Sequence, residues 1–173
     1  VVLARSGQRA EAKHVLERAR ELASARLPGD QGQAILMLHS GRFELGHDNQ
    51  AALVSLEQAQ RLFAASPETE STEMSASRHY LGTVYLELGR LDEAETQLRS
   101  AHAMFTQQYG RTDYDTLAAL GSLALASARR ERYAAAVDLL AEGRSALQGK
   151  TERKHLAMAA ALTGRQLQTA MLA

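Results

Sequence analysis

The sequence predicts an all-α protein, an α-solenoid built of antiparallel helix pairs that stack one after another. Apolar residues recur at helical spacing along the chain, whereas no stretch alternates in the two-residue period of a strand. An alanine in the second helix of each predicted pair also recurs, because Ala52, Ala94 and Ala136 are evenly spaced along the chain. Their interval of about 42 residues lies in the range of repeat proteins, and its constancy is typical of stacked repeats rather than of a single irregular core.

Composition narrows the class of protein. The chain has 173 residues with 20 basic and 20 acidic side chains, and this zero net charge argues against a dedicated nucleic-acid binder. There is no cysteine, which excludes disulfides and thiolate chemistry, and no apolar run long enough to insert into a membrane. No signal peptide is visible, so we expect a cytoplasmic protein. The start at Val1 and the preference for arginine over lysine predict a piece of a larger bacterial protein.

The clearest helix pair covers residues 78–101. Gly89 is expected to end its first helix in the left-handed conformation, and Asp92 with Glu95 to form a capping box for its second helix. Gly82 lies inside the first helix, where a missing side chain would let the second helix approach closely. The apolar faces of the two helices consist of Leu81, Tyr85 and Leu88 and of Ala94, Leu98 and Ala101.

The same pattern recurs on both sides of this pair. Before it, we expect a helix over residues 33–45 and a turn in which Asp48 caps the following helix. The apolar face of that following helix consists of Ala52, Leu56, Ala59, Leu62 and Phe63. After it, Thr112 to Asp115 form a second candidate capping box, and residues 130–132 form a turn. The helix after that turn should bury Ala136, Leu140 and Gly143.

We expect residues 1–173 to form a single domain. Its repeats are predicted at residues 1–31, truncated at the start, and then at residues 32–71, 72–112 and 113–150. Residues 151–173 are predicted to form a capping helix or part of a fifth repeat, which brings the total to about nine helices.

Residues 78–101 resemble a tetratricopeptide repeat. Arg78 stands where that family has tryptophan and the late proline is missing, but the remaining pattern is matched by Leu81, Gly82, Tyr85, Ala94 and Leu98. The long interval between the alanines is similar to that of kinesin light chains and of many bacterial tetratricopeptide proteins. Tyr109-Gly110, Asp115-Thr116-Leu117 and Leu123-Ala124 look like the inter-repeat segment of those proteins, although Gly121-Ser122 replaces their paired asparagine.

This resemblance implies a right-handed superhelix whose concave groove is lined by the first helix of each pair. By helical spacing, the groove residues are predicted to be Met37, Gly41, Glu44, His79, Thr83, Glu87, Gly121, Leu125 and Arg129. The implied function is a protein–protein interaction module that binds a peptide or a partner protein in this groove. The alternative is a structural spacer or a self-association element, and hence a homo-oligomer, inside a multidomain kinase or transcription factor.

No catalytic, cofactor or metal site is predicted. The six histidines show no metal-ligand spacing, and Gln148-Gly149-Lys150-Thr151 lacks the preceding strand and glycine-rich loop of a phosphate site. Acidic residues at 92–95 and 113–115 lie at predicted helix starts, where they favour the helix dipole. We therefore expect a protein that is not an enzyme.

The charge is uneven along the chain. From residue 116 on, the chain contains eight basic and four acidic residues, a net charge of +4. This basic end includes Arg129, Arg130 and Arg132, and it offers a second place where an acidic partner can dock.

Overall fold

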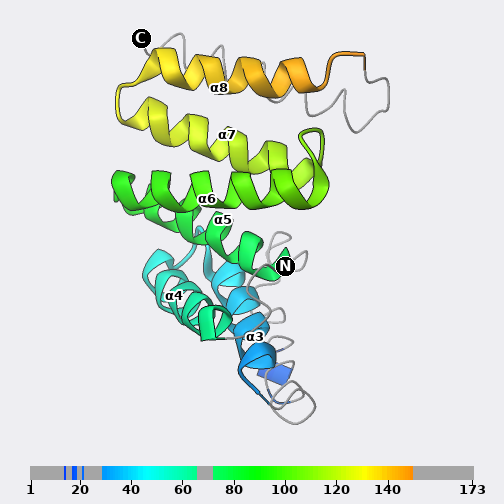
Figure 1. Cartoon of the computed structure of the whole chain (residues 1–173). Coiled ribbons are helices and arrows are strands. Elements are labelled where there is room, and N and C mark those ends of the chain that lie inside the picture. The colour runs from blue at the N-terminus through cyan, green and yellow to red at the C-terminus, as the bar shows by residue number, and fades with distance from the viewer. Residues whose placement is uncertain (1–13, 15–16, 19–20, 22–28, 66–71, 150–173) are drawn as a thin grey trace. The chain divides into compact units, whose positions relative to one another are not determined.

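The structure is a computed structural model that describes residues 14, 17–18, 21, 29–65 and 72–149 (Figure 1). The helices with defined bounds are α3 (Asp30–Glu44), α4 (Asn49–Ala65), α5 (Thr72–Glu87), α6 (Leu91–Tyr109), α7 (Tyr114–Arg129) and α8 (Tyr133–Ala146). The described residues contain no strand, so the all-α prediction is confirmed. Most of predicted repeat 1–31 and all of segment 151–173 lie outside the described residues. No helix in the described ranges combines the length and the apolar content that crossing a membrane requires.

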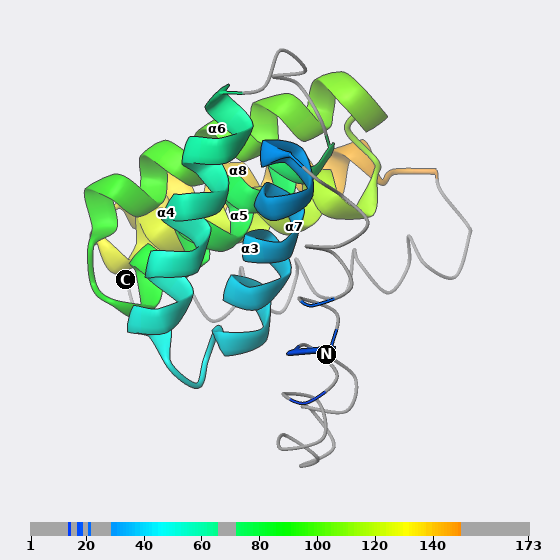
Figure 2. The ribbon, with the colours of Figure 1, turned by 90° about the horizontal axis from the view of Figure 1, so that it is seen from below.

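The chain divides into two compact units, Val1–Glu87 and Leu88–Ala173. In the first unit α3, α4 and α5 pack on one another, and Figure 2 shows α3 and α4 side by side. In the second unit α7 packs against both α6 and α8, and Figure 1 shows these three helices as successive layers. The boundary between the units falls inside predicted repeat 72–112, and the single domain over residues 1–173 stays a prediction.

The α3–α4 pair of the first unit meets at Gly41. A Cβ atom added to Gly41 would lie 2.4 Å from Cγ of Leu56 and 3.0 Å from the carbonyl oxygen of Ala52. Both partners are fully buried, so neither can yield by moving toward solvent. The absence of a side chain at this position therefore sets how closely the two helices approach. The residues that α4 buries are Ala52, Leu53, Leu56, Ala59 and Phe63. This agrees with the predicted face except that Leu53 is also buried and Leu62 is only partly buried.

In the second unit, α7 and α8 are joined by a buried apolar cluster. Ala124 of α7 belongs to one buried cluster with Ala136 and Leu140 of α8, the helix on which Gly143 is also buried. On α6 the predicted face is buried as well, at Ala94, Leu98 and Ala101. The sequence pattern thus located the buried stripes of both second helices correctly.

One residue of the predicted apolar stripe of α5 is exposed. Leu81 and Tyr85 of α5 are 2% and 7% exposed, but Leu88 is 36% exposed, so its predicted burial is wrong. The reason is local, because α5 ends at Glu87 and Leu88 lies in the turn that follows. Gly89 has a φ of 73°, which confirms the predicted left-handed residue at this turn.

The helix caps differ in part from the prediction. Asp48 caps α4 as expected, since its carboxylate accepts a hydrogen bond from the backbone N–H of Ala51 at 2.9 Å. The predicted box of Asp92 and Glu95 is wrong, because α6 begins at Leu91, and both side chains face arginines instead.

The N-cap of α7 is Asp113 and not Thr112. The Asp113 carboxylate accepts hydrogen bonds from the backbone N–H groups of Asp115 and Thr116, at 2.9 and 3.4 Å. Asp113 has the extended backbone of an N-cap, with φ −67° and ψ 150°. The predicted box was therefore placed one residue too early.

We expect Gly41→Leu to lower the free energy of unfolding by about 1–3 kcal/mol, because the new side chain must displace Leu56 from a full core. Urea denaturation monitored by circular dichroism measures this change. Ala64→Leu is the control, since Ala64 is exposed on α4 and offers room for the same side chain. Equal stability of the two variants would contradict the close-contact role of Gly41.

We expect Asp113→Ala to lower the free energy of unfolding by about 1 kcal/mol, because two N–H groups at the start of α7 lose their acceptor. Thr112→Ala removes no cap and should change it by less than about 0.5 kcal/mol. Denaturant unfolding of both variants checks the assignment, and a larger loss for Thr112→Ala would reverse it.

Candidate functional site

The close contact of Gly41 with α4 determines which side chains of α3 point away from α4. Gly41 faces Leu56 and Ala52, so it belongs to the helix contact and does not form a groove floor as predicted. Its neighbour Arg42 is exposed and lies over the ring of Tyr80 of α5, with its Cζ atom 5.4 Å from the ring centroid. Arg42 therefore takes the place of Gly41 among the groove candidates.

We define the α3–α5 face by His39 and Arg42 of α3 and by His79, Tyr80 and Thr83 of α5. The rings of His79 and Tyr80 stack with centroids 5.7 Å apart, and Tyr80 also carries the Arg42 guanidinium. The Thr83 hydroxyl donates to the carbonyl oxygen of His79 at 2.9 Å. A guanidinium over an aromatic ring at a solvent-accessible site gains about 0.5–1 kcal/mol, which favours one position of the Arg42 head group.

His39 stands beside the Arg42 cation on the α3–α5 face. Partial burial lowers the pKa of His39 and the Arg42 guanidinium lowers it further, whereas Glu73 of α5 acts in the opposite direction. Much of the side chain nevertheless remains exposed. His39 thus presents an uncharged ring that can donate or accept a hydrogen bond at neutral pH.

Most of the other predicted groove residues of the first unit are less exposed than Arg42. Met37 and Glu44 of α3 are only partly exposed, as are His79 and Thr83, while Glu87 at the end of α5 is exposed. The hydrogen bond of the Thr83 hydroxyl goes to the backbone carbonyl of His79, one helical turn earlier, and not to the His79 ring.

The predicted groove residues of the second unit lie on α7. Gly121 is buried and cannot form an open floor, whereas Leu125 is 41% exposed and Arg129 is exposed. The groove that was predicted to join the residues of α5 to those of α7 stays a prediction.

Helical spacing assigned Gly41 and His79 to the groove and so missed their neighbours Arg42 and Tyr80. The repeat interval, taken from Ala52 and Ala94, makes Thr83 equivalent to Gly41. The first helices contain Gly41 and Gly82, and the separation of these glycines is one residue shorter than the interval between Ala52 and Ala94. Aligning these two glycines would have placed Arg42 opposite Thr83, so the signal was present in their spacing.

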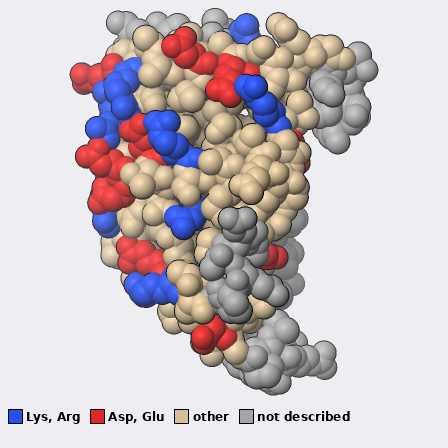
Figure 3. All heavy atoms as spheres, in the orientation of Figure 1, with Lys and Arg blue, Asp and Glu red and all other residues tan. Residues whose placement is uncertain are grey.

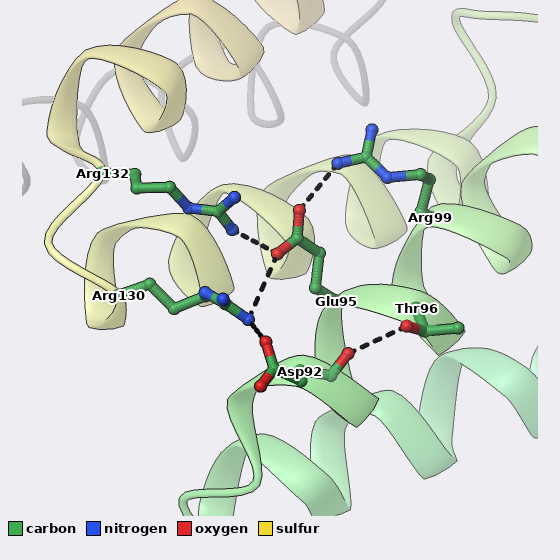
Figure 4. A network of polar contacts seen from close by, with 6 residues as sticks. All are labelled: Asp92, Glu95, Thr96, Arg99, Arg130 and Arg132. Atoms are coloured by element: carbon green, nitrogen blue, oxygen red, sulfur yellow. Dashed lines mark hydrogen bonds and ion pairs between the residues drawn. The ribbon is translucent and has the colours of Figure 1, made fainter.

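A second polar site lies between α6 and the turn that joins α7 to α8 (Figure 4). We define the ionic cluster as Asp92, Glu95, Arg99, Arg130 and Arg132. Arg99 donates to Oε1 of Glu95 at 2.7 Å, and Arg132 donates to Oε2 of the same carboxylate. Arg130 pairs with Asp92, and its Nη1 atom lies 3.7 Å from Oε2 of Glu95. Glu95 is thus the centre of the cluster, with arginines on both of its oxygens.

The ionic cluster borders a surface pocket. Burial is the largest single influence on the pKa of Glu95 and raises it, but hydrogen bonds and charges from Arg132 and Arg99 outweigh burial and lower the pKa below its ordinary value. Glu95 therefore stays ionised near neutral pH. Within the described residues, no group of three or more His, Cys, Asp or Glu side chains could hold a metal ion. The pocket is lined by Asp92, Glu95, Thr96, Arg99, Ser100, Ala103 and Arg130.

The ionic cluster changes the interpretation of the basic end. Arg130 and Arg132 are paired with carboxylates of α6, and Arg111 before α7 pairs with Glu142 of α8 at 2.8 Å. Figure 3 shows basic and acidic side chains interspersed over α6 to α8 rather than gathered by sign. The excess of basic residues in the sequence is therefore not a uniform basic patch on this face.

His102 is partly buried on α6. The Thr106 hydroxyl donates to the carbonyl oxygen of His102 at 2.7 Å. Burial lowers the pKa of the His102 ring, Glu142 raises it, and Arg111 and Arg99 lower it further. The net shift is downward, so the folded protein favours the neutral ring.

Comparisons with known proteins agree on the class of repeat. Residues 72–149 match the family model described as tetratricopeptide repeat. Two solved structures of a Podosopora anserina putative kinesin light chain, with nearly identical TPR-like repeats, superpose with a TM-score of 0.74 each. They are 24% and 22% identical in sequence, cover 98% of this chain, and are themselves covered to 85% and 86%. No curated protein sequence gives a significant match.

We expect the stability of the protein to fall, relative to a His102→Gln variant, as the pH drops through the ordinary histidine pKa of 6.5. The sign follows from linkage. The folded state lowers the pKa of His102, so the unfolded chain binds the proton more readily and acid favours unfolding. Urea denaturation of both proteins between pH 7.5 and 5.5, spanning the usual histidine range of about 5 to 8, measures the difference. A difference that is constant with pH would contradict the shift.

Proposed function

We propose that this chain, whose residues 72–149 match the tetratricopeptide repeat family, is a protein-binding module that holds a peptide or a partner protein against its first helices. Tetratricopeptide repeats are in general protein–protein interaction modules, and their fold is typically a non-catalytic scaffold. The proposal places the chain in a larger cytoplasmic bacterial protein, in keeping with its preference for arginine over lysine.

The observation that carries the proposal is the position of Arg42 over Tyr80 on the α3–α5 face. Arg42 is exposed, and its contact with the ring limits the conformations of its long side chain. A side chain that is already ordered loses less entropy when a partner binds, so more of the contact energy remains as affinity. The planar guanidinium suits a carboxylate of an acidic residue in the peptide.

Other exposed groups add a mixed chemical character to the first helices. His39 offers a neutral hydrogen-bonding ring next to Arg42 on the α3–α5 face. A peptide bound at this face would place an acidic residue against the Arg42 guanidinium. The predicted groove residues His79, Thr83 and Glu87 belong to this proposal.

We expect Arg42→Ala to weaken binding of a selected peptide about tenfold or more, because truncation removes a desolvated anchor. The peptide is obtained by selecting a displayed peptide library against the full chain, and its affinity is measured by isothermal titration. A double variant, His79→Ala with Glu87→Ala, tests the α5 part of the face in the same way.

Arg61→Ala is the matched control, since Arg61 is an exposed arginine on the second helix α4. Equal affinities for the wild type, Arg42→Ala and the double variant would overturn the assignment to the first helices. Light scattering on the free chain distinguishes peptide binding from the alternative function of self-association. A self-association element would form concentration-dependent oligomers without any peptide.

A further inference from the structure

We propose that the pocket beside the ionic cluster is a second binding site, which takes the carboxylate of an acidic side chain from a partner protein. The pocket lies between the second helix α6 and Arg130 of the α7–α8 turn. It therefore shares no residue with the α3–α5 face, and its test is independent of the proposed peptide site.

The net charge of the ionic cluster favours an anion that carries a single negative charge. Arg99, Arg130 and Arg132 carry three positive charges, and Asp92 and Glu95 carry two negative ones, so the ionic cluster has a net charge of +1. One carboxylate neutralises this charge. A phosphate group carries more negative charge and would be repelled by the two acidic residues next to it.

Arg99 supplies the donors that a ligand needs. Its side chain is 66% exposed, and it contacts Glu95 through Nη2 alone, at 2.7 Å. An arginine has five N–H donors, so the remaining ones can serve a ligand in the pocket that Arg99 lines. Ser100 adds a hydroxyl one residue further along α6. A carboxylate placed there can accept hydrogen bonds from the Arg99 guanidinium and from the Ser100 hydroxyl.

Asp92 is an internal competitor for the same position. Its carboxylate pairs with Arg130, although its side chain is 82% exposed and hence only weakly constrained by packing. Glu95, by contrast, is only 15% exposed and is engaged on both oxygens. A partner carboxylate can therefore replace Asp92 on Arg130 without disturbing Glu95.

The experiment uses acetyl-Gly-Glu-Gly amide, a peptide with one carboxylate, as the probe and the full chain labelled with nitrogen-15. Titration followed by the arginine Nε–Hε signals should give saturable shifts for Arg99 and Arg130. We expect Arg99→Gln to weaken binding about tenfold, and Asp92→Asn to strengthen it about threefold by removing the competitor. Arg99→Lys keeps the charge but loses the planar fork, so it should also weaken binding.

Arg111→Gln is the matched control. Like Arg99, Arg111 is largely exposed and pairs with one glutamate, here Glu142 at 2.8 Å, but it does not line the pocket. Equal losses for Arg99→Gln and Arg111→Gln would show binding by overall charge and overturn the proposal. Weaker binding by Asp92→Asn, or tighter binding of inorganic phosphate than of the glutamate peptide, would overturn it as well. Circular dichroism melting of each variant confirms that the fold is retained.

Discussion

The close contact between α3 and α4 at Gly41, a residue without a side chain, is the constraint on which the arrangement of the first unit depends. Gly41 lies against Leu56 and Ala52 of α4. Because the two helices meet so closely at this point, the rotation of α3 about its own axis is settled. That rotation determines which side chains of α3 remain on the outside, among them Arg42.

Acidic residues near helix starts have different roles although their positions in sequence are alike. Asp48 and Asp113 cap their helices, because each precedes the first helical residue and can accept hydrogen bonds from the backbone N–H groups that follow. Asp92 and Glu95 already lie inside α6, where they form ion pairs with Arg130 and Arg132 of the turn between α7 and α8. Acidic side chains therefore satisfy backbone donors in one place and organise an ionic cluster in the other.

The two candidate sites are separated by helix type. The α3–α5 face belongs to first helices and combines an arginine, an aromatic ring and a neutral histidine. The pocket of the ionic cluster belongs to a second helix and a turn, and it is dominated by charge. A repeat protein can thus offer surfaces of different chemistry on the two helices of its repeats, which suits a scaffold that binds more than one partner.

The sequence by itself determined the helical class, the repeat interval, most of the buried stripes and the turn glycines, because these depend on local spacing and on φ preferences. It correctly identified Ala94, Leu98 and Ala101 as buried and Gly89 as left-handed. Only the tertiary structure decided that Gly41 is a helix contact and that Arg42 lies over Tyr80. The reason is that a shift of one residue turns a helical side chain by about 100°, and this rotation is chosen by packing between helices that are distant in sequence.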